Sequence, residues 1–254
     1  MTVWVKICGI TRPEDAEAAF EAGVDAIGLN FVGGPRRITV GAAREILAEV
    51  PQGRLVVALA ALGPEGVEPP LEELFEAYAI RHVQVYGNVS SENIRRLAVQ
   101  GRRSLVVCRL AGHGLQAHGL EARATAESHL LPRDGEKAGP EGGDVRRAIE
   151  GALAGLATDD LFAVLLDARV PGKQGGTGII LDWHAIAQAR GRGELEGLPP
   201  LILAGGLDPD NISRAVALVR PWGVDVSSGV ETRPGRKNRT AVADFVAAVK
   251  SSER

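Results

Sequence analysis

Two side chains far apart in the sequence are of types that can transfer protons. Cys8 ends the apolar run Val3 to Ile7 and is followed at once by Gly9. A strand that delivers a thiol to a glycine turn is how many α/β enzymes present a reactive group. Asp167 stands in the same position, directly after Phe162 to Leu166. A lone cysteine is more often a small buried residue, and such an aspartate often caps a loop. The surrounding elements must therefore show whether these two residues are structural or functional.

Glycine-rich turns follow later apolar runs. The segment 175–178 reads Gly-Gly-Thr-Gly and precedes a helix expected to begin near Asp182-Trp183, while 204–207 and 227–231 follow the runs Leu201 to Leu203 and Val224 to Val226. Glycine lets backbone N–H groups approach an anion closely. In barrels of parallel strands the last two such loops frequently bind phosphate, so we expect a phosphorylated substrate.

One arginine follows the second apolar run. Arg36 lies in the segment 33–38, Gly-Gly-Pro-Arg-Arg-Ile. Its planar donor fork suits a carboxylate, although loop arginines are usually only solvated.

Eight short apolar runs alternate with longer helix-like stretches, which is typical of parallel strands joined by crossover helices. Eight such units in about 250 residues predict a closed (β/α)8 barrel, with a doubly wound open sheet as the alternative. We expect a capping box at Thr11 to Glu14 and an N-cap at Asp208. The expected strands are Val3–Ile7, Ala26–Phe31, Arg54–Leu59, His82–Val85, Ser104–Cys108, Phe162–Leu166, Leu201–Leu203 and Val224–Val226.

The chain of 254 residues reads as a single domain, 1–254, with a loop insertion at about 111–143 between the fifth and sixth strands. A helical pattern resumes at Asp144. His113, His118 and His129 lie in or near the insertion, but their spacing matches no metal-ligand motif, so no metal is expected. Cys108 is interpreted as a small core residue.

Composition limits the partners. The chain is 45% hydrophobic with a formal net charge of -3, and no basic face suggests nucleic acid or a membrane surface. Its two cysteines are too few for a disulfide framework, and no signal segment or apolar stretch near 20 residues is seen. We therefore expect a cytoplasmic protein with a small-molecule partner; its oligomeric state is not readable.

Several motifs, in this order, closely resemble phosphoribosylanthranilate isomerases. They are Lys-Ile-Cys-Gly-Ile-Thr at 6–11, Pro-Arg-Arg-Ile at 35–38, Leu-Leu-Asp at 165–167, Gly-Gly-Thr-Gly at 175–178, Leu-Ala-Gly-Gly-Leu at 203–207 and Val-Asp-Val-Ser-Ser-Gly-Val-Glu at 224–231. The resemblance covers most of the chain apart from the middle. It implies a (β/α)8 barrel of tryptophan biosynthesis that needs no cofactor and catalyses an Amadori rearrangement.

The resemblance also implies roles for individual residues. Asp167 would be the general acid that opens the ribose ring, and Cys8 the general base that removes the C2 hydrogen. Arg36 would bind the anthranilate carboxylate. The phosphate would be held near the substrate-binding residues Gly205, Gly206, Ser227, Ser228 and Gly229, with Asp225 at the same mouth.

The chain departs from the family pattern at Tyr86, where the family usually has a histidine, and in the segment 57–62, Val-Ala-Leu-Ala-Ala-Leu, which lacks an aromatic residue common after the third strand. Two alternatives therefore stay open. One is an isomerase of another phosphoribosyl-amine, such as an aminoimidazole carboxamide sugar, although that family normally uses two aspartates where this chain has Cys8 and Asp167. The other is a barrel that binds a phosphosugar without turnover.

Overall fold

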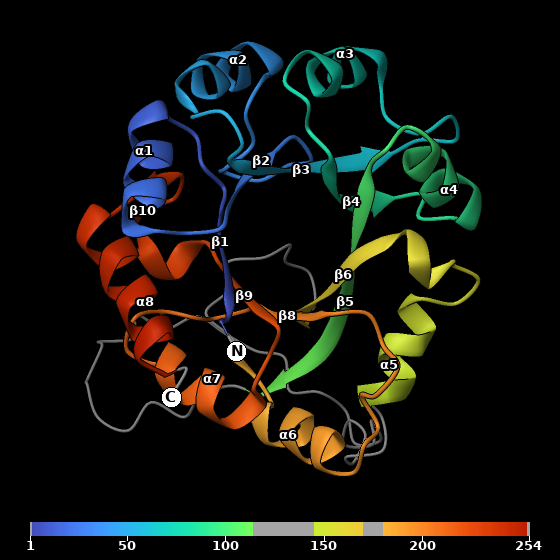
Figure 1. Cartoon of the computed structure of the whole chain (residues 1–254), viewed down its shortest axis with the longest axis vertical. Coiled ribbons are helices and arrows are strands. Elements are labelled where there is room, and N and C mark those ends of the chain that lie inside the picture. Colours follow the sequence, from blue (N-terminus) through green and yellow to red (C-terminus); the bar gives the residue numbers. More distant parts are fainter. Residues whose placement is uncertain (1, 114–144, 170–179, 253–254) are drawn as a thin grey trace, which may run out of the picture.

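Parallel strands close into a barrel surrounded by helices (Figure 1). The computed structural model describes residues 2–113, 145–169 and 180–252. All eight expected strands are confirmed; five of them are longer than the apolar runs, two have the same length and one is shorter by a residue. They are β1 (Trp4–Cys8), β2 (Ala26–Asn30), β3 (Leu55–Leu62), β4 (His82–Gly87), β5 (Arg103–His113), β6 (Leu161–Arg169), β8 (Leu201–Leu203) and β9 (Gly223–Val226).

Barrel closure follows from the strand order. The barrel strands run β1 to β6 in sequence, then β8 and β9, and β9 pairs with β1 in parallel, with Val5 opposite Val224. An open doubly wound sheet is thereby excluded. Two short additions accompany the barrel: β7 (Ile180–Leu181) pairs antiparallel with the end of β5, and β10 (Glu231–Arg233) pairs with β11 (Arg236–Lys237). Because β5 continues to His113, it occupies the first residues of the predicted insertion, and 114–143 lie outside the described residues.

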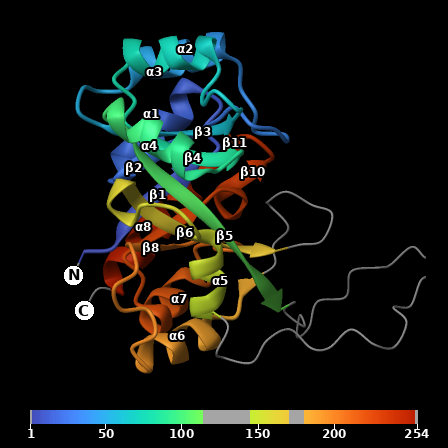
Figure 2. The same cartoon turned by 90° about the vertical axis from the view of Figure 1, so that its right-hand side faces the viewer.

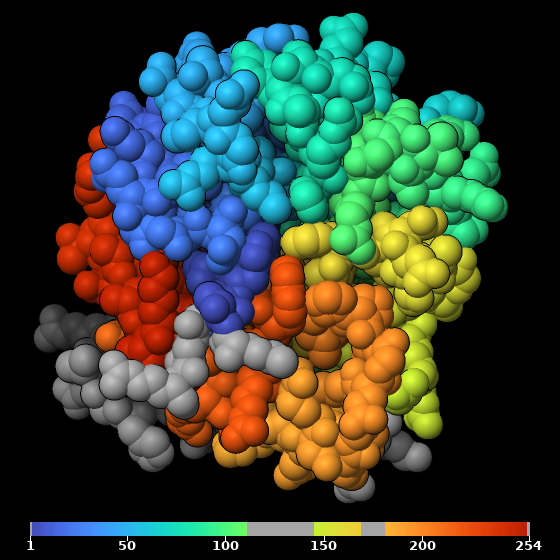
Figure 3. Space-filling view, in the orientation of Figure 1, coloured from blue at the N-terminus to red at the C-terminus, as the bar shows by residue number. Residues whose placement is uncertain are grey.

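Helices return the chain from each strand to the next and form a rim around the barrel (Figure 1), and the space-filling view shows successive segments following one another around the molecule in chain order (Figure 3). They are α1 (Pro13–Ala22), α2 (Val40–Glu49), α3 (Pro69–Ala77), α4 (Ser91–Val99), α5 (Val145–Ala152), α6 (Trp183–Gly191), α7 (Ile212–Val219) and α8 (Arg239–Ser251), with single 3-10 turns η1 (Thr158–Asp160) and η2 (Ser228–Val230). None of the helices in the described ranges is long and apolar enough to cross a membrane.

Two of the predicted helix starts differ in detail. The capping box at Thr11 to Glu14 is wrong: Arg12 is the N-cap of α1 and makes no side-chain cap bond. The Thr11 hydroxyl instead donates to the carbonyl of Gly235, so it joins α1 to the turn between β10 and β11. The N-cap of α7 is Asn211 and not Asp208 as expected. Asp208 instead caps the turn before α7, accepting from the N–H of Asp210 at 3.0 Å and of Asn211 at 2.9 Å.

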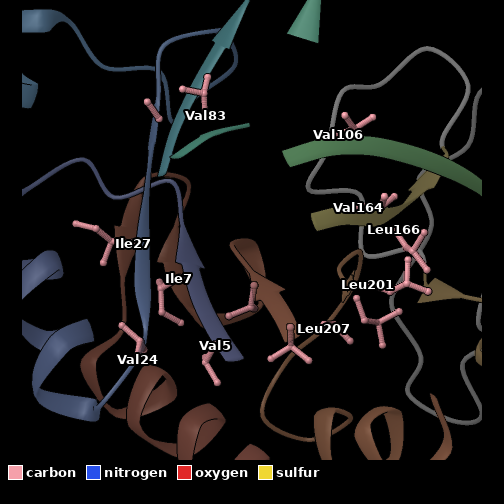
Figure 4. Close-up of a cluster of buried hydrophobic side chains, with 14 of the residues drawn as sticks. Val5, Ile7, Val24, Ile27, Val83, Val106, Val164, Leu166, Leu201 and Leu207 are labelled. Atoms are coloured by element: carbon pink, nitrogen blue, oxygen red, sulfur yellow. The ribbon is translucent and has the colours of Figure 1, made fainter. Parts of the chain in front are cut away.

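The core follows from the alternation of side chains along each strand. Residues that point outward, among them Val5, Ile7, Ile27, Val83 and Leu166, pack against the helices and form the larger cluster (Figure 4). A smaller cluster fills the inside of the barrel. Its buried members are Ala26, Val57, Leu105, Ala163, Leu165, Ile202 and Ala204. Packed side chains inside the barrel make it solid rather than a pore, so a ligand must bind at one end.

Aromatic side chains gather where the barrel strands begin. The rings of Trp4 and Trp222 stack with their centroids 5.4 Å apart, and Phe162 contacts both edge to face. His82 packs on Phe162 with centroids 4.5 Å apart. This aromatic base closes the end of the barrel where the parallel strands start, so the opposite end, where β10 and β11 lie (Figure 2), is left for the site.

Candidate active site

A cavity opens at the carboxyl ends of the barrel strands, and the predicted site residues gather in it. Of the nine, all but Gly229 line this cavity. They are Cys8, Arg36, Asp167, Gly205, Gly206, Asp225, Ser227 and Ser228. These eight residues come from five barrel strands, β1, β2, β6, β8 and β9, or from the loops after them. Such convergence at the strand ends is expected for catalytic groups of this architecture.

Cys8 is the last residue of β1, and its thiol points into the barrel beside β2. A Cβ atom added to Gly28 would lie 2.9 Å from the Cys8 sulfur, so glycine at this position makes room for the thiol. Two residues earlier on the same face, Lys6 is fully buried and donates from Nζ to Oδ1 of Asp225 at 2.7 Å and to Gln84 at 3.2 Å. A buried ammonium therefore lies beneath the thiol.

Electrostatics act on Cys8 in opposite directions. Burial raises the pKa of the Cys8 thiol, and the charge of Asp225 adds to this, while Lys6 and Lys237 oppose it; the net pKa is raised. Burial also works against the charge on Lys6, but Asp225, through its charge and hydrogen bond, and the charges of Cys8 and Tyr86 together outweigh it, so the pKa of Lys6 rises and the ammonium keeps its proton. The protein thus keeps a fixed cation where a thiolate would form.

Asp167 belongs to β6 and faces the same cavity. Burial raises the pKa of its carboxyl group, and the charge of Asp225 does the same. The N–H of Ala168, which donates to Oδ1 at 2.9 Å, and the guanidinium of Arg109 work in the opposite direction without reversing the shift. A carboxyl group held protonated to higher pH than usual is suited to donate a proton.

Tyr86 connects to the buried ammonium through one side chain. The amide nitrogen of Gln84 donates to the Tyr86 hydroxyl at 2.7 Å, and the amide oxygen of Gln84 accepts from Lys6. Burial raises the pKa of Tyr86 to about 12. The phenol is therefore neutral at physiological pH and lines the cavity as a hydrogen-bonding group without charge.

Arg36 reaches the cavity from the loop after β2, and its fork is partly occupied. Its Nε and Nη2 donate to the two carboxylate oxygens of Glu231 at 2.8 Å and 2.7 Å. Lys237 donates to the same carboxylate at 2.7 Å. Glu231 and Lys237 are partners that reasoning from the sequence missed. Glu231 stands in the resemblance motif, but nothing in the spacing of 36 and 231 shows that they meet.

The turn after β8 has the backbone shape expected of a phosphate site. Gly205 and Gly206 both have positive φ, 79° and 62°, which L side chains rarely adopt. Their N–H groups donate to no acceptor within the part of the chain that the structure describes, and Asn211 fixes the turn by donating to the Gly206 carbonyl at 2.8 Å. Two adjacent free donors at the mouth can receive an anion.

Gly229 and Ser227 have different surroundings from those expected. A Cβ atom on Gly229 would lie 1.9 Å from the Leu207 carbonyl oxygen, so this glycine lets the turn after β9 pack on the turn after β8. The Ser227 hydroxyl donates to the Cys8 carbonyl at 3.0 Å and joins β9 to β1. Both residues therefore support the shape of the cavity, whatever contact their backbones make with a ligand.

Other candidates lie elsewhere or cannot be placed. Cys108 is buried in the cluster outside the barrel, away from the cavity, and burial raises its pKa to about 11. The Gly-Gly-Thr-Gly segment at 175–178, and His118 and His129, lie outside the described residues, as does the side chain of His113. Asp182 caps α6 by accepting from the N–H of Ala185 at 2.9 Å, so that expected helix start is confirmed. Arg109 also lines the cavity and was not predicted.

Comparison with known protein sequences gives a consistent result. A family model described as N-(5'phosphoribosyl)anthranilate (PRA) isomerase matches residues 113–248, more than half of the chain. A protein of Magnetococcus marinus named N-(5'-phosphoribosyl)anthranilate isomerase is 35% identical over 100% of this chain and 98% of its own length. One of the same name from Myxococcus xanthus is 37% identical over 99% of this chain and 98% of its own.

Solved structures agree with the sequences. A phosphoribosyl anthranilate isomerase of Thermotoga maritima is 28% identical, with a TM-score of 0.70, and the match covers 98% of this chain and 100% of that one. A phosphoribosyl anthranilate isomerase in complex with reduced 1-(o-carboxyphenylamino)-1-deoxyribulose 5-phosphate matches with the same identity and coverage and a TM-score of 0.68. From its sequence, its barrel and the residues at its mouth, this chain belongs to the N-(5'-phosphoribosyl)anthranilate isomerase family.

Proposed function

We propose that this protein isomerises N-(5-phosphoribosyl)anthranilate to 1-(2-carboxyphenylamino)-1-deoxyribulose 5-phosphate, a step of tryptophan biosynthesis. The observation that carries the proposal is that Cys8 and Asp167 line one cavity together with the glycine turn after β8. That arrangement offers a base, an acid and an anion site to one small phosphorylated molecule. We place the enzyme in the cytoplasm, where a thiol that acts as a base stays reduced.

Ring opening is assigned to Asp167. Its protonated carboxyl group gives a proton to the ring oxygen of the ribose as the bond from that oxygen to C1 breaks. The electron pair of the anthranilate nitrogen forms a double bond to C1, so a protonated Schiff base results and Asp167 is left as a carboxylate. The raised pKa of Asp167 supports this role because it keeps the proton on the carboxyl group to higher pH than in an ordinary aspartate.

Proton removal from C2 is assigned to Cys8. The Schiff base makes the C2 hydrogen acidic, and the Cys8 thiolate takes that proton while the electrons of the C–H bond move to neutralise the nitrogen. The product of this step is an enolamine. It becomes the ketone when C1 gains a proton and the C2 hydroxyl loses one, so substrate and product are isomers. The enzyme is restored when Cys8 releases the proton it took and Asp167 regains one, both by exchange with solvent. Lys6, beneath Cys8, favours the thiolate that the step needs.

Binding is assigned to the two ends of the cavity. The backbone of Gly205, Gly206 and Ser228 takes the phosphate, with the neighbouring Ser227 and Gly229 shaping the turn, and Arg36 takes the carboxylate of the anthranilate ring. Asp225 stays paired with Lys6 below the reacting atoms and adds to the raised pKa of Asp167. The proposed chemistry uses only these side chains and no cofactor.

Turnover of freshly generated N-(5-phosphoribosyl)anthranilate by the purified protein tests the proposal. Cys8→Ala and Asp167→Asn are each expected to lower turnover by about a hundredfold to ten-thousandfold, the usual contribution of acid and base groups. Cys108→Ala is the matched control, because this second thiol faces the helices and its loss should leave turnover intact. Full activity in Cys8→Ala would contradict the assignment.

A phosphoribosyl aminoimidazole carboxamide substrate is the second arm of the same experiment. Its aromatic part carries a neutral carboxamide where anthranilate carries a carboxylate, so it offers Arg36 no charge partner. We expect turnover of the anthranilate compound alone. Turnover of the carboxamide compound instead would reassign the substrate while leaving the roles of the acid and base in place.

A further inference from the structure

We propose that Glu231 is a positioning residue, which fixes the carboxylate-binding edge of Arg36 and connects it to the turn that carries Cys8. This inference rests on the proposed function, which places the substrate carboxylate at Arg36 and the base at Cys8. It concerns how Arg36 and Cys8 are held in the right position relative to each other to act on one substrate.

The contact between Glu231 and Arg36 sets the plane of the guanidinium. The Glu231 side chain is 3% exposed and accepts from Nε and Nη2 of Arg36, one bond to each of its oxygens. Two parallel bonds of this kind hold a guanidinium in one orientation. Nη1 makes no hydrogen bond with the described part of the chain, so this nitrogen is the one left for a ligand in the cavity that Arg36 lines.

Gly9 makes this orientation possible. Its φ is 75°, and a Cβ atom there would lie 2.5 Å from Cδ of Arg36. The arginine stem therefore crosses directly over the turn that follows Cys8. A shift of that turn would move Arg36, and a shift of Arg36 would press on the turn.

Lys237 carries the connection from Glu231 to Cys8. Its Nζ donates to Glu231 at 2.7 Å, to the carbonyl of Cys8 at 2.6 Å and to the carbonyl of Ser227 at 3.0 Å. An ammonium has three donors, and each has an acceptor here. Because Lys237 is buried, these contacts are not replaced by water. The carboxylate of Glu231 is thus shared between the binding arginine and the lysine that holds the Cys8 backbone.

The charges of this triad favour an anionic ligand. Arg36 and Lys237 bring two positive charges and Glu231 one negative charge, so the triad itself carries a net charge of +1. Hydrogen bonds from Arg36 and the charge of Lys237 outweigh burial and lower the pKa of Glu231, which stays ionised. The nearby Asp15 accepts from the backbone N–H of Lys237 but is itself paired with Arg12. Buried charges are stable when paired, and a substrate carboxylate at Nη1 would complete the pairing.

The test compares Glu231→Gln with the unchanged enzyme, in a Cys108→Ala background so that Cys8 is the sole thiol. Steady-state turnover of N-(5-phosphoribosyl)anthranilate gives KM and kcat, and iodoacetamide gives the alkylation rate of Cys8. We expect KM to rise about tenfold or more, since a charge-assisted contact is lost. Lys237→Met is expected to change the alkylation rate and to lower kcat. Glu72→Gln, which breaks an ion pair with the buried Arg102 on the outer helices, is the control and should leave KM unchanged.

A double-mutant cycle separates a positioning role from a general loss of stability. If Glu231 acts through Arg36, then Glu231→Gln adds little to the KM of Arg36→Ala, within about twofold. Fully additive effects, or an unchanged KM in folded Glu231→Gln, would overturn the proposal. Should Glu231→Gln fail to fold, Glu231→Asp keeps the charge but is one carbon too short to reach both partners, and the same expectations apply.

Failure of the proposed function gives a different result. If Arg36→Ala itself leaves KM unchanged, the assignment of the substrate carboxylate to Arg36 fails. The link from Glu231 to the Cys8 turn is then judged by alkylation alone. An alkylation rate that stays unchanged in both Glu231→Gln and Lys237→Met would overturn that link as well.

Discussion

Nζ of Lys6 lies 2.7 Å from Oδ1 of Asp225, and both side chains are buried on the inner face of the barrel directly below the reactive thiol. The two come from β1 and β9, neighbouring strands that close the ring. This ion pair places a charge of each sign under the reaction, and each charge acts on both groups. Lys6 lowers and Asp225 raises the pKa of Cys8 and of Asp167, with Lys6 the stronger of the two at Cys8 and Asp225 the stronger at Asp167. One pair therefore favours ionisation of the base and protonation of the acid.

Replacing Lys6 by methionine is expected to cost both stability and reactivity. The substitution leaves the Asp225 carboxylate buried without its partner, which typically costs about 3 to 5 kcal/mol. It also removes the main group that opposes the raised pKa of Cys8, so that pKa should rise further. Urea unfolding measures the first effect, and the pH dependence of Cys8 alkylation by iodoacetamide measures the second. Lys250→Met, at an exposed position of α8, is the control; a Cys8 pKa that did not rise would contradict this account.

The pH profile of kcat/KM should be bell-shaped, with its acidic limb set by Asp167. The active form needs a protonated Asp167 and an ionised Cys8, and Asp167 titrates first because a carboxyl group is the stronger acid. Below the pKa of Asp167, kcat/KM rises with pH because more of the Cys8 thiolate forms. Between the two pKa values, loss of the Asp167 proton balances the gain in thiolate, so kcat/KM stays level. Above the pKa of Cys8, kcat/KM falls because only loss of the Asp167 proton continues. Because burial raises the pKa of Asp167, the acidic midpoint should lie above the usual value near 3.9.

Two observations would separate Asp167 from the substrate in that profile. The second pKa of a phosphate monoester is about 6, so the substrate contributes a limb of its own. A limb that persists in Asp167→Asn belongs to the substrate, and one that disappears belongs to Asp167. An acidic midpoint at or below the ordinary range of an aspartate would contradict the raised pKa.

Removing the hydroxyl of Tyr86 should disturb the polar chain that leads to Lys6. In Tyr86→Phe the buried amide of Gln84 loses its acceptor, at a cost of about 1 to 3 kcal/mol. Tyr86→His keeps an acceptor nitrogen and should lose less stability. Thermal unfolding of the two variants beside the unchanged protein measures this difference. Equal stability of all three proteins would mean that water replaces the hydroxyl without cost.

Alanine at position 229 should be poorly tolerated. Its Cβ atom would lie 1.9 Å from the carbonyl oxygen of Leu207, so the two turns at the phosphate end must move apart. Overpacking of this kind costs about 1 to 3 kcal/mol, and the displaced turn should also raise KM. Gly151→Ala, in a helix where an added Cβ atom meets nothing within 4 Å, is the matched control. Unfolding in urea measures the stability of both variants, and steady-state turnover measures their KM. Equal stability and equal KM of the two variants would contradict the expectation.

The barrel could be predicted from the sequence because the patterns that specify its strands and helices are local. Each strand is a short apolar run, such as Leu201 to Leu203, and the alternation with helical stretches sets the topology. The positions of Cys8 and Asp167 at strand ends follow from the same reading. Helix caps were less predictable: the type and spacing of Thr11 fit a capping box, but its hydroxyl finds a partner 224 residues away at Gly235.

Contacts between distant segments account for what the sequence did not reveal. Arg36 and Glu231 are separated by 195 residues, and only the folded barrel brings them together. Gly229 is another such case, because a glycine before a phosphate site and a glycine under a neighbouring backbone look the same in a sequence. Its close approach to Leu207 depends on how two loops cross in space. Residue types indicated the chemistry, while the partners that hold them had to be seen.

The aromatic base allows closure of the barrel to be followed by tryptophan fluorescence. Trp4 opens the first barrel strand and Trp222 precedes the last, yet their indoles stack with centroids 5.4 Å apart. Such a contact forms only after the chain has paid the entropy of closing a loop of some two hundred residues. Two of the three tryptophans of the chain are in this stack, so intrinsic fluorescence during refolding would follow the meeting of the two ends of the sheet more than any local step.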